Sequence, residues 1–144
     1  MKLKALVAIC VLVTVAPLAI ADTAAVKFTP LVKDSTAQFG DLREKFNDAR
    51  LSLVEMLLND NKHGEDQQKL VHDSADAVSK SLAHKGAKFR ELEIVWAAFK
   101  KTRETELVPL ILAGKIEEAN KIGGGIQQAR YSLIAELMND LERH

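Results

Sequence analysis

The sequence predicts an all-α protein, an antiparallel up-down-up-down four-helix bundle, and three observations support this prediction. Apolar residues recur at steps of three and four along four successive segments of residues 34–142, which is the spacing of one buried helix face. Short clusters of turn-forming residues, each with a glycine, separate these segments. No segment has the apolar and polar alternation that is typical of a strand. Short connections favour antiparallel neighbours.

The first two helices are expected to form a hairpin. The first begins near residues 34–36, which are all suitable N-caps, and ends in the turn-forming residues 59–64. Its expected buried stripe consists of Phe39, Leu42, Phe46, Ala49, Leu53, Met56 and Leu57. The second begins near Glu65, with Gly86 as its expected C-cap. Its stripe of small side chains consists of Val71, Ala75, Val78 and Leu82.

The third and fourth helices are each interrupted by a residue type that disfavours helix. The third is expected from Phe89 to Gly114, with a kink at Pro109. The fourth begins at Ile116 and has the longest stripe, which consists of Ile116, Ala119, Ile122, Ile126, Ala129, Leu133, Leu137 and Leu141. The three glycines 123–125 inside it cost roughly 2–3 kcal/mol relative to alanine. One interpretation of the three glycines is close helix packing or a local break of the helix. The alternative is a flexible point that a ligand approaches.

Residues 1–21 have the pattern of a signal peptide. Lys2 and Lys4 give a positive start, residues 5–20 are almost wholly apolar, and residues 19–21 form an A-x-A cleavage site. We therefore expect cleavage after Ala21 and a mature domain of residues 22–144 that is periplasmic or secreted. An uncleaved leader would instead anchor the chain to a membrane.

Composition excludes several kinds of protein. The 20 basic and 20 acidic residues are interspersed, so no basic stripe indicates a nucleic-acid partner. The only cysteine, Cys10, lies in the leader, so the mature chain is expected to have no disulfide and no thiol nucleophile.

Two segments resemble the four-helix sensor domain of methyl-accepting chemotaxis proteins. The matching residues of its second hairpin are Trp96, Phe99, Arg103, Glu106, Leu107, Leu112, Ala113, Gly114, Lys115, Glu118 and Ala119. Those of its first helix are Leu42, Arg43, Phe46, Asn47, Arg50 and Leu53. The likeness covers most of residues 30–142. It implies an extracytoplasmic bundle, often a dimer, that binds ligands between helices near the membrane-distal end.

The sequence also departs from that family. Arg50 matches the position of a ligand-binding arginine in amino-acid-sensing members, whereas later arginines of that set fall at Glu55 and Asn59 here. This difference argues against an amino-acid ligand held by the family's arginine cluster. The family's receptors re-enter the membrane after the fourth helix, whereas this sequence stops at His144. We therefore expect a chain that cannot transmit a signal alone.

Arginines are the candidate ligand-binding residues. Arg43, Arg50 and Arg130, with Arg103 as a fourth, flank the expected stripes and could bind an anionic group bidentately. Trp96 and Tyr131 could line the same cleft, although core packing is the simpler interpretation of Trp96. In the alternative interpretation the arginines pair with acidic neighbours, namely Asp48, Glu55 or Glu106. No catalytic constellation and no metal-ligand spacing of histidines occurs in the sequence. We therefore predict a non-enzymatic protein with no cofactor.

The expected partner is a small-molecule ligand or a periplasmic protein, with a homodimer as one expected form. Three alternatives remain open. A b-type haem carrier would use Met56 as an axial ligand, although residues 131–138 offer no histidine as its partner, and Met56 is more simply a core residue. A helical periplasmic chaperone or stress protein would bind unfolded clients. A membrane-anchored sensor fragment would keep its leader.

Overall fold

The computed structural model describes residues 37–144, and all regular secondary structure in this range is helical. The α-helices are α1 (Ala37–Leu58), α2 (Glu65–Ala83), α3 (Arg90–Thr102), α4 (Val108–Leu112), α5 (Ile116–Ile122) and α6 (Gln128–Arg143). A π-helical turn at Arg103–Leu107, the first π-turn, joins α3 to α4. Another at Gly123–Gln127, the second π-turn, joins α5 to α6. Residues 37–144 therefore form four helical rods, and the predicted all-helical character is confirmed for this part of the chain.

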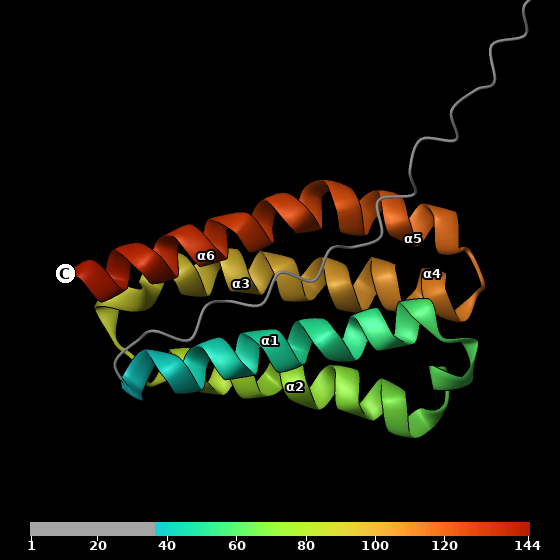
Figure 1. The fold of residues 1–144 in the computed structure, drawn as a ribbon, viewed down its shortest axis with the longest axis horizontal. Coiled ribbons are helices and arrows are strands. Elements are labelled where there is room, and N and C mark those ends of the chain that lie inside the picture. The colour runs from blue at the N-terminus through green and yellow to red at the C-terminus, as the bar shows by residue number, and fades with distance from the viewer. Residues whose placement is uncertain (1–36) are drawn as a thin grey trace, which may run out of the picture.

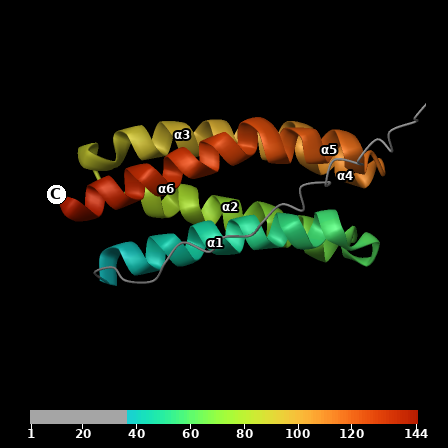
Figure 2. The ribbon, with the colours of Figure 1, turned by 45° about the horizontal axis from the view of Figure 1, so that its top comes forward.

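The four rods lie side by side along the long axis of the molecule (Figure 1). In that view α6 and α3 form the upper pair, and α1 and α2 form the lower pair. The rods remain side by side when the molecule is turned (Figure 2). The α1–α2 and α4–α5 connections lie at one end, whereas the α2–α3 connection lies at the other end with the C-terminus. Within residues 37–144 no helix is both long and apolar enough for a membrane span, and the expected signal peptide lies outside the described residues.

Gly114 ends the third rod as the turn chemistry requires. Gly114 has a φ of 72°, its N–H donates to the Ile111 carbonyl, and the N–H of Lys115 donates to the Leu110 carbonyl. These two bonds form the Schellman motif. Gly86 is not the C-cap of α2 that the sequence predicts, because α2 ends two residues earlier with His84 as its C-cap. Gly86, with a φ of 83°, lies in the connection between α2 and α3.

Buried side chains form two clusters along the bundle. The larger cluster contains four aromatic contacts, three of them linked through Trp96 and Phe99, and among these is an edge-to-face pair of Phe46 and Trp96 with centroids 5.1 Å apart. Trp96 is a core residue, and its Nε1 donates to Ser79 Oγ. The second cluster contains Met56, which is fully buried. The predicted stripes of α1 and α2 are buried in these clusters, except that Leu53 and Leu57 are only partly buried against the second, and those two predictions are confirmed.

Beyond the glycines, the predicted stripe of the fourth rod is wrong at Ile126, Ala129 and Leu133, whereas Leu137 and Leu141 are partly buried against the larger cluster. Ile126 is 52% exposed and Leu133 is 39% exposed, and Ala129 is also exposed. The buried residues of this part are instead Gln127, Tyr131, Ile134 and Met138. The cause is the second π-turn, because a π-helical turn closes with i→i+5 hydrogen bonds and so holds one extra residue. The inward face of α6 is consequently shifted by one position.

The irregularity expected at Pro109 lies in the preceding turn. Pro109 falls in the first turn of α4, directly after the first π-turn. A proline ring clashes with the carbonyl four residues earlier, which here belongs to Thr105 inside that π-turn. The wider turn removes this conflict without breaking the rod.

Candidate functional site

An apolar cavity of about 40 Å³ lies beside the two π-turns. It is lined by Arg50, Leu53, Val54, Leu57, Phe99, Leu107, Ile111, Ala119, Gly123, Gln127, Gln128 and Tyr131. The lining therefore includes one cationic side chain, two amides and no carboxylate. The volume exceeds the roughly 10–15 Å³ that one water needs, so the cavity has room for a small group.

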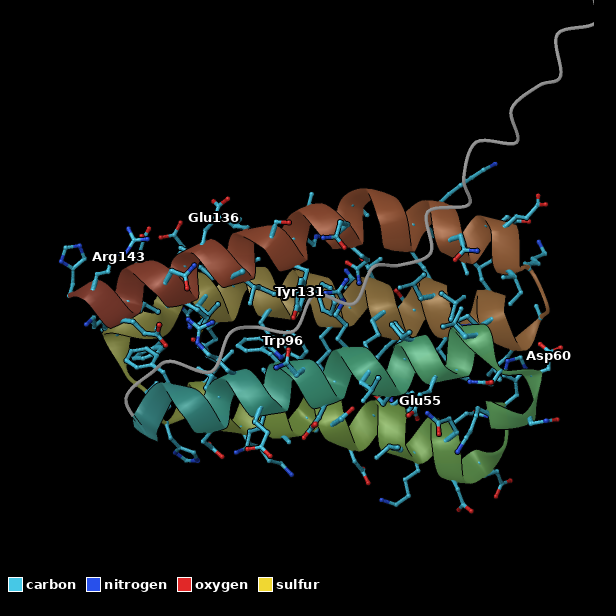
Figure 3. The ribbon with its side chains drawn as sticks, in the orientation of Figure 1. Glu55, Asp60, Trp96, Tyr131, Glu136 and Arg143 are labelled. Atoms are coloured by element: carbon cyan, nitrogen blue, oxygen red, sulfur yellow. The ribbon has the colours of Figure 1, made fainter. Side chains whose placement is uncertain are left out.

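Arg50 and Tyr131 form the polar side of this cavity. Arg50 is only 6% exposed, and its guanidinium carbon lies 4.1 Å from the centroid of the Tyr131 ring. Arg50 Nη2 also donates to Gln128 Oε1 at 3.2 Å. Burial raises the pKa of the Tyr131 hydroxyl, against a smaller opposing effect of Arg50. Figure 3 shows Tyr131 and Trp96 between the two helix pairs, whereas Glu136 projects outward from α6.

Arg103 places a second positive charge in the interior near the cavity. It is fully buried between α1 and α2. Its guanidinium donates to the Ala49 carbonyl, to the Val71 carbonyl at 2.7 Å and to Ser52 Oγ at 3.0 Å. Ala49 directly precedes Arg50, and Phe99 and Leu107 of the cavity lining lie four residues to either side of Arg103.

The buried charge of Arg103 has no ion-pair partner in the described part of the chain. None of the ion pairs among residues 37–144 includes it, and its buried Nε makes no hydrogen bond there. Burial lowers the pKa of Arg103 to about 10, opposed by the charge of Glu104. The interior beside the cavity therefore holds a buried guanidinium that forms no ion pair among residues 37–144 and that the charge of Glu104 offsets only in part.

Arg130 supports the cavity wall from outside the lining. Arg130 Nη1 donates to Thr102 Oγ1 at 2.7 Å and to Gln127 Oε1 at 3.0 Å. Gln127 Nε2 donates to the Phe99 carbonyl at 2.9 Å. These bonds join the start of α6 to the end of α3, and they fix the amide of Gln127 at the cavity.

Arg43 lies away from the cavity. Its Nε and Nη2 donate to the two carboxylate oxygens of Glu142 at 2.9 and 2.7 Å, and Nη2 also donates to Asn139 Oδ1. It precedes Arg50 by seven residues, about 10 Å along a helix. Arg43 therefore joins α1 to the end of α6, and its acidic partner is Glu142 rather than Asp48, Glu55 or Glu106.

Two polar residues of the cavity lining, Gln127 and Gln128, are not among the binding residues that the sequence predicts. A glutamine at a buried position contradicts an apolar stripe, so Gln127 is recognised only when the one-residue shift of the second π-turn is known. The glycines 123–125 were the available signal, because such a run inside a helix indicates an irregular turn.

Metal-binding side chains do not gather in the described range: among residues 37–144 no three His, Cys, Asp or Glu residues could hold one ion. His63 Nε2 lies 3.0 Å from the Met56 carbonyl oxygen. Met56 itself packs with apolar neighbours in the second cluster. The face of α6 toward the core bears Tyr131, Ile134 and Met138, so it offers no histidine ligand opposite Met56.

Comparison of the chain with protein-family models, with curated proteins and with solved structures gives no match.

Proposed function

We propose that this chain is a non-enzymatic binding protein whose cavity takes a small organic anion with an apolar body. The anionic group contacts Arg50, and the apolar body lies among Leu53, Leu57 and Ile111. The observation that carries the proposal is the nearly buried Arg50 guanidinium at an apolar cavity whose lining contains no acidic side chain.

The electrostatics of the site favour one negative charge. Arg50 lines the cavity, and Arg103 adds a fully buried positive charge behind its wall. A charge pair in a medium of low dielectric interacts more strongly than in water, and a guanidinium matches a carboxylate bidentately. Gln127 and Gln128 supply amide donors at the same cavity. A cationic ligand would be repelled by the two guanidinium groups.

The size and lining of the cavity restrict the apolar body. A cavity of about 40 Å³ fits a short aliphatic chain. Each buried methylene contributes roughly 0.8 kcal/mol, so affinity increases with chain length until the cavity is full. Short monocarboxylates of about two to four carbons are the ligand class that combines these properties.

The proposal also includes the location and arrangement of the chain. The leader is cleaved after Ala21, and residues 22–144 act in the periplasm or as a secreted protein. They form an antiparallel up-down-up-down bundle, similar to a chemoreceptor sensor domain, and a partner protein or a second copy reads the ligand state. The alternation of the three connections between the two ends in Figure 1 supports this arrangement. The intact mass of the exported protein tests the cleavage.

Calorimetric titration of the exported protein with butyrate and with butyramide tests the binding proposal. The two compounds share one carbon chain, and only butyrate is charged. We expect saturable binding of butyrate and none of butyramide. Arg50→Met should abolish butyrate binding with the circular dichroism spectrum unchanged, and Arg50→Lys should weaken it. Equal binding of the two compounds, or undiminished binding by Arg50→Met, would contradict the proposal.

Arg90→Met is the matched control. Arg90 is an exposed arginine whose side chain pairs with Glu93 on the surface of α3. The Arg90→Met variant loses the same charge as Arg50→Met, but at a residue that is not part of the cavity lining. It should therefore bind butyrate as the wild type does. A Soret absorbance band in the exported protein would instead favour the haem alternative.

A further inference from the structure

A groove of about 400 Å³ lies between α1 and α2, and it shares no residue with the cavity beside Arg50. Ser52 and Ser74 belong to its lining, and their hydroxyl oxygens, 3.0 Å apart, join the two helices. Glu55, which is labelled in Figure 3, belongs to its α1 wall. The other lining residues are Lys45, Asp48, Leu51, Leu70, Asp73 and Ala77.

The groove continues toward the α1–α2 connection. An adjoining hollow of about 590 Å³ is lined by Asn61, Lys62, Gly64, Glu65, Asp66, Gln67 and Leu70. Because Leu70 belongs to both linings, the two hollows together are called the α1–α2 groove. From Lys45 to the end of α1 at Leu58 the helix rises about 20 Å. This length matches a partner helix of about 13 residues.

Exposed leucines lie along both walls of the α1–α2 groove. Leu51 on α1 is 42% exposed, and Leu70 on α2 is 48% exposed. Leu58 follows Leu51 by seven residues, so it lies on the same face of α1, and it is 67% exposed. Large apolar side chains that gather on a surface mark an interaction site. A groove with leucines on both walls fits the apolar stripe of a helix.

The rim of the α1–α2 groove is acidic. Its linings contain five carboxylates and two lysines, namely Asp48, Glu55, Glu65, Asp66 and Asp73 against Lys45 and Lys62. Lys45 already pairs with Asp41. None of the ion pairs among residues 37–144 includes Asp48 or Glu55. A partner that complements this rim is therefore basic.

We propose that the α1–α2 groove is the docking surface for a basic amphipathic helix of another protein. The apolar stripe of that helix lies between the leucines, and its lysines or arginines pair with Asp48 and Glu55 at the rim. The charges disfavour a second copy of this chain, because a two-fold dimer through this groove would place two acidic rims against each other. The inference adds a partner surface to the proposed function and does not depend on a ligand in the cavity.

The buried Arg103 determines how the partner helix lies in the groove. Arg103 Nη2 donates to Ser52 Oγ at 3.0 Å and to Ser74 Oγ at 3.4 Å, and the side chain is fully buried. A positive charge directly behind the two serines repels a basic side chain placed over them. The apolar stripe of the partner therefore faces the serines, and its basic side chains lie at the rim.

Fluorescence anisotropy of the exported protein with a labelled synthetic peptide tests the proposal. The probe is a helical peptide of about 14 residues that has leucines at steps of three and four and lysines at the other positions. A peptide with glutamate in place of every lysine is its control. We expect saturable binding of the leucine–lysine peptide, weakened by added salt, and no binding of the leucine–glutamate peptide.

One pair of variants tests the charge of the rim. Asp48→Asn with Glu55→Gln should weaken binding of the leucine–lysine peptide at least about fivefold. Glu91→Gln with Glu117→Gln is the matched control, since it loses the same charge at two exposed residues outside the groove. It should change the affinity by less than about twofold.

A second pair of variants tests the apolar walls. Leu51→Ser with Leu70→Ser should weaken peptide binding at least about tenfold, with the melting temperature close to that of the wild type because both side chains are exposed. Ile94→Ser with Ile126→Ser is the matched control, since it removes two apolar side chains that are also exposed but lie outside the groove. It should bind the peptide as the wild type does.

Several results would overturn the docking proposal. They are equal binding of the two peptides, undiminished binding by either groove variant, or equal losses in a groove variant and its control. A dimer that Leu51→Ser with Leu70→Ser converts to monomer in sedimentation would assign the groove to a second copy instead. Displacement of the leucine–lysine peptide by a synthetic peptide of residues 22–36 would assign it to this chain itself. Butyrate binding is unaffected by each of these results, so the two proposals fail separately.

Discussion

The one-residue shift of α6 has a direct consequence for stability, which two adjacent alanine substitutions measure. Ile134 is fully buried in the larger cluster, whereas Leu133 is 39% exposed. A regular helix through residues 116–143 would bury Leu133 in the stripe read from the sequence. Ile134→Ala and Leu133→Ala therefore distinguish the π-helical turn from an unbroken helix.

The expected magnitudes differ severalfold. Ile134→Ala removes three carbon atoms at roughly 0.8 kcal/mol each and leaves a cavity, so it should lower the free energy of unfolding by about 3 kcal/mol. Leu133→Ala removes a side chain that is already partly in water, and it should cost about 1 kcal/mol or less. A domain of this size loses about 4 °C of melting temperature per kcal/mol. The melting temperature should therefore fall by roughly 12 °C in Ile134→Ala and by at most about 4 °C in Leu133→Ala.

Urea unfolding followed by circular dichroism gives both values, and equal m-values of the variants would show that the denatured state is unchanged. The Leu133→Ala variant serves as the control for removing an apolar side chain from the same helix turn. A larger loss for Leu133→Ala than for Ile134→Ala would refute the shifted register and with it the second π-turn.

Two further predictions concern the arginines. Arg43→Met should lower the free energy of unfolding by about 2–4 kcal/mol, because it leaves the partly buried Glu142 without its bidentate partner; in a double-mutant cycle with Glu142→Gln, strictly additive losses would contradict the pairing. Burial lowers the pKa of Arg103 to about 10 in the folded state, whereas its pKa in the unfolded state is higher. At a pH between these two pKa values, Arg103 is therefore protonated more fully in the unfolded state than in the folded state. The stability of the wild type should therefore rise relative to Arg103→Met from about pH 9 to about pH 11, and urea titrations that stay parallel over this range would contradict the buried charge.

The sequence predicts those parts of the fold that depend on local spacing. The stripes of α1 and α2 and the stop at Gly114 follow from helical period and glycine chemistry, and the structure has them as expected. The face of α6 could not be predicted by the same reasoning, because periodicity assumes an unbroken helix. One extra residue at positions 123–125 moves every later side chain to a new face.

The candidate site was predictable only in part, for a related reason. Arg50 was identified as a binding residue, and it lines the cavity. Arg43 has the same sequence character, but its partner Glu142 lies 99 residues away. Such a pairing depends on how α1 and α6 meet in space. Gln127 reaches the cavity only through the shifted register, so its contribution could not be read from the stripe.

The central claim is that a small organic anion binds in the cavity beside Arg50, and amide NMR of the exported protein during a butyrate titration tests it most directly. We predict saturable shifts of the side-chain amides of Gln127 and Gln128 and of the Gly123 backbone amide, all with one dissociation constant. Butyramide should leave these signals unchanged. Shifts confined to surface lysines, or no shifts at any butyrate concentration, would contradict the claim.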